Sequence, residues 1–253
     1  MIYKFPTMPA YSSLISEYEP DKSSTFGLLV YGPSGCGKTT LAASFPEPFF
    51  IDADRGMRSL GKIYPRVQLQ DTETPFALIM SILTDALAGR GEWAPTGKLG
   101  KIRTIVIDSV TSLIDDYLGV ETMNEAKRNV LMEKLSYDEY GKIQSRMTAL
   151  SSVIKDLTHK YWVVMTALVE EEKDESSGKL TGKPKLTGKY RDKIMADFDE
   201  TYYMECQTQI SGPPKFITYP RPYLWYRAKT RLLKPSVTAI VDATYDKIVA
   251  NFK

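Results

Sequence analysis

The stretch YGPSGCGKTT, Tyr31 to Thr40, constrains this chain more than any other part of its sequence. It meets the pattern G-x-x-x-x-G-K-[ST], follows an apolar run that suits a buried strand, and precedes a segment that suits a helix start. Glycines in such a loop let backbone N–H groups turn inward around phosphates, and the helix N-terminus favours negative charge. A plain Gly/Ser turn is the alternative, but the complete motif favours a nucleoside triphosphate site.

The motif assigns roles to individual side chains. Lys38 is expected to reach the β- and γ-phosphates, and the Thr39 hydroxyl is expected to ligate Mg²⁺. We take ATP as the nucleotide, although the sequence has no motif for the base pocket. The residues expected to hold the nucleotide are Gly32, Pro33, Ser34, Gly35, Cys36, Gly37, Lys38, Thr39 and Thr40.

Two acidic residues follow apolar runs that read as strands. Asp108 ends the run TIVID, where a carboxylate can hold Mg²⁺ through water, or cap the next helix. Asp54 lies just past the run FFID, where a carboxylate can orient the water that attacks the γ-phosphate, or face solvent in a turn. We predict a catalytic role for both, with Thr39 and Asp108 as the metal-binding pair.

Alternating patterns predict the fold class, an α/β protein with a mainly parallel, twisted sheet flanked by helices. The later aromatic runs ETYYMEC, KFITYP and YLWYRAKT predict extra C-terminal antiparallel strands, and Val237–Phe252 predicts a closing helix. The core strands are expected at Phe26–Tyr31, Phe49–Asp52, Thr104–Asp108 and Trp162–Ala167, and the core helices at Lys38–Ser44, Pro75–Leu87, Val110–Leu118 and Tyr137–Lys160.

Length and composition limit the other possibilities. With 253 residues and 43% hydrophobic content, we expect one domain over residues 26–253 and an extended N-terminal arm over residues 1–25. A net charge of +2 means that any nucleic-acid surface has to be a local patch. Two cysteines without pairing or metal spacing, and no long apolar run or signal-peptide core, predict a cytoplasmic protein without a membrane partner.

The phrases FIDADRG and VIDSVTSL resemble the RecA-type ATPase core. That resemblance implies that Asp54 activates water, although the family usually has Glu at this position. It also places the phosphate-sensing residue, usually Gln or His, at Ala167 or at the adjacent Thr166.

A closer resemblance is to phage-encoded RecA-like P-loop ATPases of the single-strand annealing and AAA-type nucleotide-binding kind. The phrases that carry it are GPSGCGKTTLAASFPEPFFIDAD, DEYGKIQSRM, PKLTGKYRDKI and RAKTRL, which span most of residues 26–235. It implies a role in phage DNA recombination, annealing or replication in the host cytoplasm. Single-stranded DNA and a phage single-strand-binding protein are the partners that it implies.

Residues 170–193 read as a mobile loop that could contact DNA. The segment holds the repeat KLTGK twice, at Lys179–Lys183 and at Lys185–Lys189. In RecA-like proteins a loop at this position touches single-stranded DNA, whereas charge-rich loops in general are simply solvated. A second basic segment, near Lys127, Arg128 and Lys134, is equally well explained as a helix face. The residues expected to touch DNA are Lys179, Lys183, Lys185, Lys189, Tyr190 for base stacking, and Arg191.

The run YRAKTRL places Lys229 and Arg231 at alternate positions, so both can point the same way. RecA-superfamily ATPases often carry a K-x-R pair that reaches the γ-phosphate bound by a neighbouring subunit. A pair of surface cations is the alternative. The resemblance implies a homo-oligomer, in which Tyr3 and Phe5 of the arm could dock on a neighbour.

Three functions therefore compete. We favour an ATPase associated with, and stimulated by, single-stranded DNA. The runner-up is a protein in which nucleotide drives DNA binding or assembly with little turnover. A nucleotide kinase with residues 170–193 as its lid fits the IDSVTSL strand end and the K-x-R pair poorly.

Overall fold

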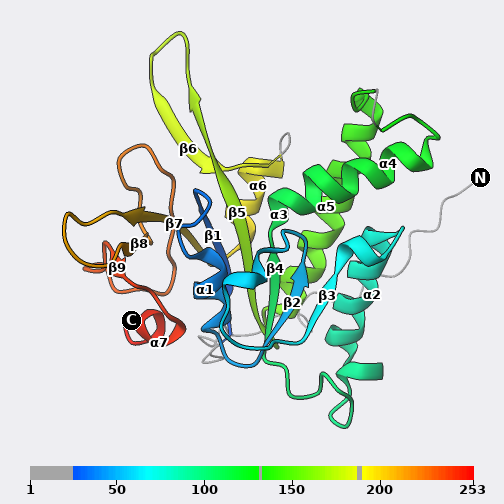
Figure 1. Cartoon of the computed structure of the whole chain (residues 1–253), viewed down its shortest axis with the longest axis horizontal. Coiled ribbons are helices and arrows are strands. Elements are labelled where there is room, and N and C mark those ends of the chain that lie inside the picture. The colour runs from blue at the N-terminus through cyan, green and yellow to red at the C-terminus, as the bar shows by residue number, and fades with distance from the viewer. Residues whose placement is uncertain (1–24, 131–132, 187–189) are drawn as a thin grey trace, which may run out of the picture.

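The computed structural model describes residues 25–130, 133–186 and 190–253, so the expected N-terminal arm lies outside it except for Thr25. One sheet forms the centre, in the order β3-β2-β4-β5-β1-β7-β8-β9, with β6 paired to β5 (Figure 1). The strands are β1 Gly27–Gly32, β2 Pro48–Asp52, β3 Arg66–Gln68, β4 Thr104–Asp108, β5 Trp162–Lys173, β6 Leu180–Pro184, β7 Glu200–Gln207, β8 Lys215–Tyr219 and β9 Ile240–Val241.

Strands β3, β2, β4, β5, β1 and β7 run parallel, and β8 and β9 are antiparallel additions. The predicted fold class is therefore confirmed. One detail differs, since ETYYMEC forms β7 as a parallel neighbour of β1. Because parallel strands end at the same edge, the carboxyl ends of β1, β2 and β4 lie together at one edge of the sheet, where β5 continues beyond its neighbours into the hairpin with β6.

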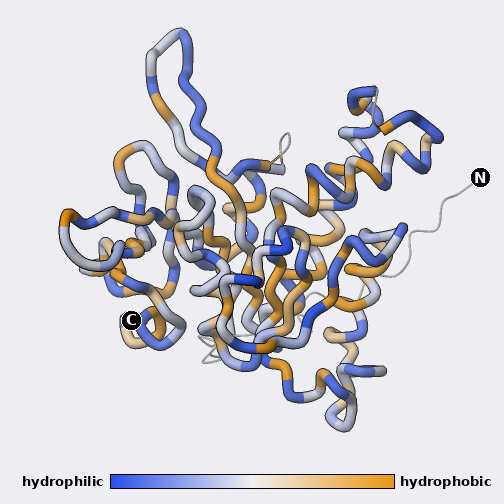
Figure 2. The backbone as a smooth tube through the Cα atoms, in the orientation of Figure 1, coloured by the Kyte–Doolittle hydropathy of each residue, from blue (hydrophilic) through white to orange (hydrophobic). Residues whose placement is uncertain are grey.

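Helices cover both faces of the sheet. The larger core packs side chains of α2, α5 and α6 on one face, and the smaller core packs α1 and α7 on the other. Figure 2 shows the hydrophobic residues gathered along the central strands and the helix faces that meet them. The helices are α1 Lys38–Ala43, α2 Pro75–Ala88, α3 Val110–Ser112, the π-helix Leu113–Leu118, α4 Gly119–Glu125, α5 Tyr137–Leu157, α6 Tyr190–Asp197 and α7 Tyr245–Val249.

Three predicted segments need correction. Residues 170–193 are not a structureless loop, because β5 continues to Lys173 and pairs with β6 in a hairpin that projects from the sheet (Figure 1). Residues 223–230 contact β6 and β7 through isolated backbone bridges and not as a regular strand. The ring of Tyr226 also stacks on that of Tyr203, with 3.6 Å between the ring centroids. The closing helix spans just Tyr245–Val249, after β9. Within the described residues, no helix has the length and apolar character to cross a membrane.

Candidate functional site

The phosphate-binding loop connects β1 to α1, as its sequence predicts. Gly35 and Gly37 have φ angles of 77° and 90°, values that side chains other than glycine rarely adopt. Position 32 requires glycine for a different reason, because a Cβ there would come 2.0 Å from the Met204 carbonyl oxygen. The Lys38 ammonium is buried in the loop and donates to the carbonyl oxygens of Gly32 at 3.0 Å and Pro33 at 2.7 Å. The loop therefore holds a positive charge where a phosphate would lie.

Thr39 and Asp108, the two residues expected to bind Mg²⁺, are in direct contact. The Thr39 hydroxyl donates to Oδ2 of Asp108 at 2.8 Å, and the Thr166 hydroxyl donates to Oδ1 at 2.5 Å. Strand β5 lies between β1 and β4, so Thr166 lies between the loop and the acid. Both oxygens of a carboxylate that is 1% exposed are thus hydrogen-bonded.

Burial raises the pKa of Asp108 above its ordinary value, and the negative charges of Asp54 and Asp52 raise it further. The hydrogen bonds from Thr166 and Thr39 act in the opposite direction, because they favour the ionised form. A bound divalent cation would favour that form as well. The site therefore holds a carboxylate whose charge needs a cation nearby.

Asp54 lies beside this pair. A methyl group built on Gly56 would come 3.7 Å from Oδ2 of Asp54, 3.8 Å from Oγ1 of Thr39 and 4.0 Å from Oδ2 of Asp108. The three oxygens therefore lie within 4.0 Å of one point, the position at which a Gly56 side chain would begin. The Asp54 carboxylate is exposed, and its Oδ1 accepts a 3.1 Å hydrogen bond from the Ser112 hydroxyl.

The donor chemistry fits Mg²⁺, which takes oxygen ligands and keeps several waters. The described residues contain no group of three or more His, Cys, Asp and Glu side chains that could hold a metal alone. Thr39 would bind such an ion directly and Asp108 through water, with phosphate oxygens completing the ligand set.

Sequence reasoning missed two residues here. Ser112 donates a hydrogen bond to Asp54. The sequence feature that could have indicated this role is the position of Ser112 about one helical turn after Asp108. Thr111 accepts from the Leu168 N–H at 3.0 Å and donates to the Lys185 carbonyl at 3.0 Å, so it joins α3 to the base of the hairpin. No sequence pattern signals this contact, because it joins residues far apart in the chain.

The six residues expected to touch DNA have different surroundings. Tyr190 cannot stack on a base as placed here, because its ring is 2% exposed in the larger core and its hydroxyl lies 2.5 Å from that of Ser151. Tyr190 and Ile194 of α6 both belong to the larger core, so Tyr190 helps to hold α6 against it. That part of the prediction is wrong.

Two of the expected cations are held by acids of β5. Lys183 is 6% exposed and pairs with Glu172 at 2.5 Å. Arg191 pairs with Glu170 at 2.9 Å and also with Glu172. Glu172 therefore neutralises Lys183 across the hairpin, and Glu170 and Glu172 together neutralise Arg191 of α6.

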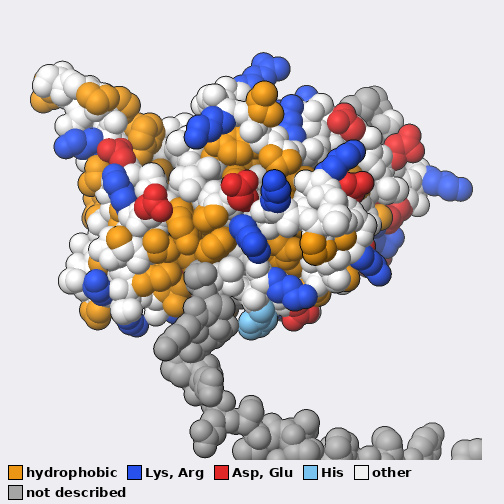
Figure 3. Space-filling view, turned by 90° about the horizontal axis from the view of Figure 1, so that it is seen from below, with side chains coloured by type: hydrophobic (Ala, Val, Ile, Leu, Met, Phe, Trp, Pro, Cys, Tyr) orange, Lys and Arg blue, Asp and Glu red, His pale blue; other side chains and the backbone are white. Residues whose placement is uncertain are grey.

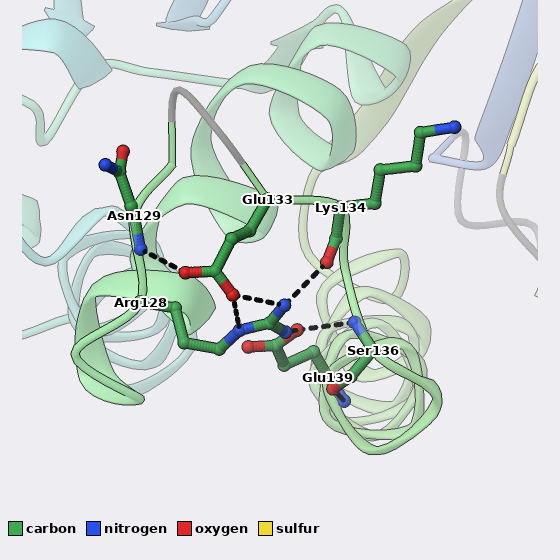
Figure 4. Close-up of polar contacts among 6 residues, drawn as sticks. All are labelled: Arg128, Asn129, Glu133, Lys134, Ser136 and Glu139. Carbon is green, nitrogen blue, oxygen red and sulfur yellow. Dashed lines mark hydrogen bonds and ion pairs between the residues drawn. The ribbon is translucent and has the colours of Figure 1, made fainter.

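Lys179 and Lys185 remain exposed, although Lys185 lies 3.3 Å from Asp115. Lys189 lies outside the described residues. The second basic segment is also engaged: Arg128 binds Glu133, Glu139 and the Lys134 carbonyl, closing the turn between α4 and α5 (Figure 4).

Lys229 and Arg231 lie away from the loop of their own chain. Lys229 pairs with Thr201, and Arg231 bridges to Asp199 at 3.0 Å, whose other oxygen accepts from the N–H of Gly27 at the start of β1. This is the amino end of the strand, whereas the phosphate-binding loop follows its carboxyl end. Figure 3, viewed from the end opposite the hairpin, shows Lys and Arg side chains scattered among hydrophobic and acidic ones.

Comparisons with known proteins add a family and a fold. The family model described as an AAA domain, AAA_24, matches residues 26–232. No curated protein matches the chain. Among solved structures the chain is similar to the RadB recombinase, with 11% identity and a TM-score of 0.46 over 85% of this chain and 84% of that one. It is also similar to flagellar accessory protein FlaH from Methanocaldococcus jannaschii, with 13% identity and a TM-score of 0.33 over 87% of this chain and 90% of that one. At such identities these likenesses concern the fold alone.

Proposed function

This chain belongs to the AAA domain family AAA_24, and on that premise we propose that it binds ATP with Mg²⁺ and hydrolyses it. One observation carries the proposal. The oxygens of Thr39, Asp54 and Asp108 all lie within 4.0 Å of one point beside Gly56, next to a loop that holds the Lys38 ammonium. Lys38 would bind phosphate, and Thr39 and Asp108 would hold the metal. The exposed carboxylate of Asp54 would face the attacking water.

The chain's own groups divide the work. Lys38 exchanges its two carbonyl partners for phosphate oxygens, and Thr39 turns its hydroxyl oxygen to the cation. Bound Mg²⁺ neutralises charge on the β- and γ-phosphates. Asp54, held by Ser112, accepts a hydrogen bond from the water whose oxygen attacks the γ-phosphorus. The bond to the β-phosphate oxygen breaks, and ADP and inorganic phosphate leave.

We propose that single-stranded DNA associates with the hairpin formed by β5 and β6. The support is the resemblance to RecA-like annealing ATPases, together with the exposed cations Lys179 and Lys185. Strand β5 carries Thr166 beside the nucleotide site and continues directly into the hairpin. Single-stranded DNA bound to the hairpin would therefore be linked to the nucleotide site through β5. Action in phage recombination, annealing or replication is part of the same proposal.

We also propose a homo-oligomer in which Lys229 and Arg231 serve a neighbour's nucleotide. Their place at the amino end of β1 keeps them from the loop of their own chain, so a phosphate that they reach has to belong to another copy. The buried carboxylate of Glu200 accepts from the backbone N–H groups of Arg231 and Leu232, which fixes the segment that presents them.

A second candidate is nucleotide-driven assembly with little turnover. Asp54 favours this candidate, because its side chain is one methylene shorter than the Glu usual at this position. Its carboxylate is also exposed and accepts, among the described residues, a single hydrogen bond, from the Ser112 hydroxyl. Phosphate release from MgATP separates the two, measured alone and with single-stranded or duplex DNA. Turnover that rises with single strands and is lost in Lys38→Ala supports the ATPase. Tight ATP binding without turnover under any condition supports the assembly switch.

A further inference from the structure

The strand order places the phosphate-binding loop between two different neighbourhoods. Strand β1 has β5 and then β4 on one side, and β7 and then β8 on the other. Asp108 ends β4 on the first side. Phe216 lies near the start of β8, which runs antiparallel to β7, so it reaches the edge of the sheet where the loop lies. Asp108 and Phe216 therefore flank the loop from opposite sides.

Phe216 contacts the loop directly. The position that a Cβ of Gly37 would take lies 3.3 Å from Cδ1 of Phe216 and 3.1 Å from Cε of Met204. The backbone of Phe216 is fixed by Asp242, whose carboxylate accepts from the Phe216 N–H at 3.1 Å and whose N–H donates to the Phe216 carbonyl at 2.6 Å. The ring itself is half-buried, and its cross-strand partner Cys206 is exposed. A half-buried aromatic ring on a hydrogen-bonded backbone segment thus borders the loop on the side away from the acids.

We infer that Phe216 is the platform on which the base of the bound nucleotide stacks. The inference rests on the proposed function, which puts the γ-phosphate at Thr39 and Asp108. A nucleoside triphosphate is an extended molecule, so its base lies at the opposite end of the loop, toward β7 and β8. Every base has a flat π-face, and a ring that is held in place stacks on it without a large loss of side-chain freedom.

The platform assigns a ligand class. Stacking is sequence-tolerant and grows with the area of the base, so purine triphosphates bind more tightly than pyrimidine triphosphates. The plainer role for Phe216 is to pack against Gly37 and Met204 in the smaller core. The two roles differ in one measurable way: packing supports the binding of all phosphates, whereas stacking supports the base alone.

The experiment compares the binding of MgATP with that of Mg²⁺ and inorganic tripolyphosphate, by calorimetry, in wild type and in Phe216→Leu. Leucine keeps apolar packing and removes the flat ring. We expect the affinity for ATP to fall about 5- to 100-fold and that for tripolyphosphate to stay within twofold. Phe216→Trp, which keeps a flat aromatic ring, should bind ATP about as tightly as wild type does. Val241→Ala, a truncation of an exposed side chain on the adjacent strand β9, should change neither.

Equal losses for both ligands would overturn the inference, because they would show a packing role. Unchanged ATP affinity in Phe216→Leu would also overturn it. Failure of the proposed function looks different: wild type and Lys38→Ala would then bind tripolyphosphate alike, whatever stands at position 216. A base-dependent loss without any hydrolysis would leave the platform in place and favour the assembly switch.

Discussion

The hydroxyl of Thr166 donates a 2.5 Å hydrogen bond to Oδ1 of Asp108, which ties β5 to the acidic end of β4. Thr166 is fully buried, and two residues later the N–H of Leu168 donates to Thr111. Strand β5 is therefore attached to the candidate site at one point and to the base of the hairpin at the next. These contacts connect Asp108 to β5, and β5 through Thr111 to Lys185 at the base of the hairpin.

Thr166→Val should reduce ATP turnover about 10- to 100-fold with little change in ATP binding. The substitution removes a hydrogen bond to a charged group, which contributes about 1.5–3 kcal/mol, and leaves one oxygen of a buried carboxylate without its donor. Steady-state rates and nucleotide affinity measure the effect. Thr166→Ser is the control, because it keeps the hydroxyl and should keep most of the rate. A valine variant at the wild-type rate would contradict the role of Thr166.

Asp108→Asn should stabilise the apo protein while it abolishes Mg²⁺-dependent turnover. Burial raises the folded-state pKa of Asp108, so the folded chain binds this proton more tightly than the unfolded chain does. The ionised carboxylate costs no stability below the ordinary pKa near 3.8, and its cost grows as pH rises from there through the raised folded value. At neutral pH we expect the melting temperature to rise by about 2–4 °C. The gain should disappear at acidic pH, and a lower Tm at neutral pH would contradict this account.

Mixing two inactive variants tests whether the K-x-R pair acts in trans. Arg231→Ala should bind ATP but turn over slowly, and Lys38→Ala should bind no ATP. A mixture lets an intact Arg231 on one copy face an intact loop on another, so phosphate release should recover toward a substantial fraction of the wild-type rate. Recovery should require protein concentrations at which the copies assemble. If the mixture stays as inactive as its components, Arg231 acts within its own chain or only in its ion pair with Asp199.

The ion pairs of the hairpin change the expected salt dependence of DNA binding. The slope of log K against log salt is about −0.7 per phosphate contact for single strands. Contacts by all five cations expected from the sequence would give roughly −3.5, whereas contacts by Lys179 and Lys185 alone give roughly −1.4. Replacing both by Ala should therefore flatten log K against log salt. Lys183→Ala is the matched control: its ammonium is buried against Glu172, so the slope should stay unchanged. A slope that responds to Lys183 and not to Lys179 and Lys185 would contradict this assignment.

The sequence predicted the parts of the site that depend on local pattern. The motif located Lys38 and Thr39, and the strand TIVID was predicted with the bounds of β4, which places Asp108 at the sheet edge. Parallel strands end together, so the meeting of Thr39 with Asp108 followed from the fold class. These predictions rest on periodicity and loop chemistry, which neighbours in the sequence determine.

The hairpin could not be predicted in this way. Residues 170–173 are charged, and they form a strand because Lys183 and Arg191 satisfy Glu170 and Glu172 across a pairing that no local pattern shows. Tyr190 likewise looks available for stacking in sequence, and its burial depends on α5, which supplies Ser151. Tertiary partners decided both cases.

The most direct test of the central claim is phosphate release from MgATP by Asp54→Asn, with ATP affinity measured in parallel. Asparagine keeps the size of the side chain and can still accept from Ser112, but it cannot act as a base toward water. We predict unchanged ATP affinity and a rate that is about 10²- to 10⁴-fold lower than that of wild type. A variant that hydrolyses ATP at the wild-type rate would contradict the proposal that the oxygens around Gly56 form the catalytic site.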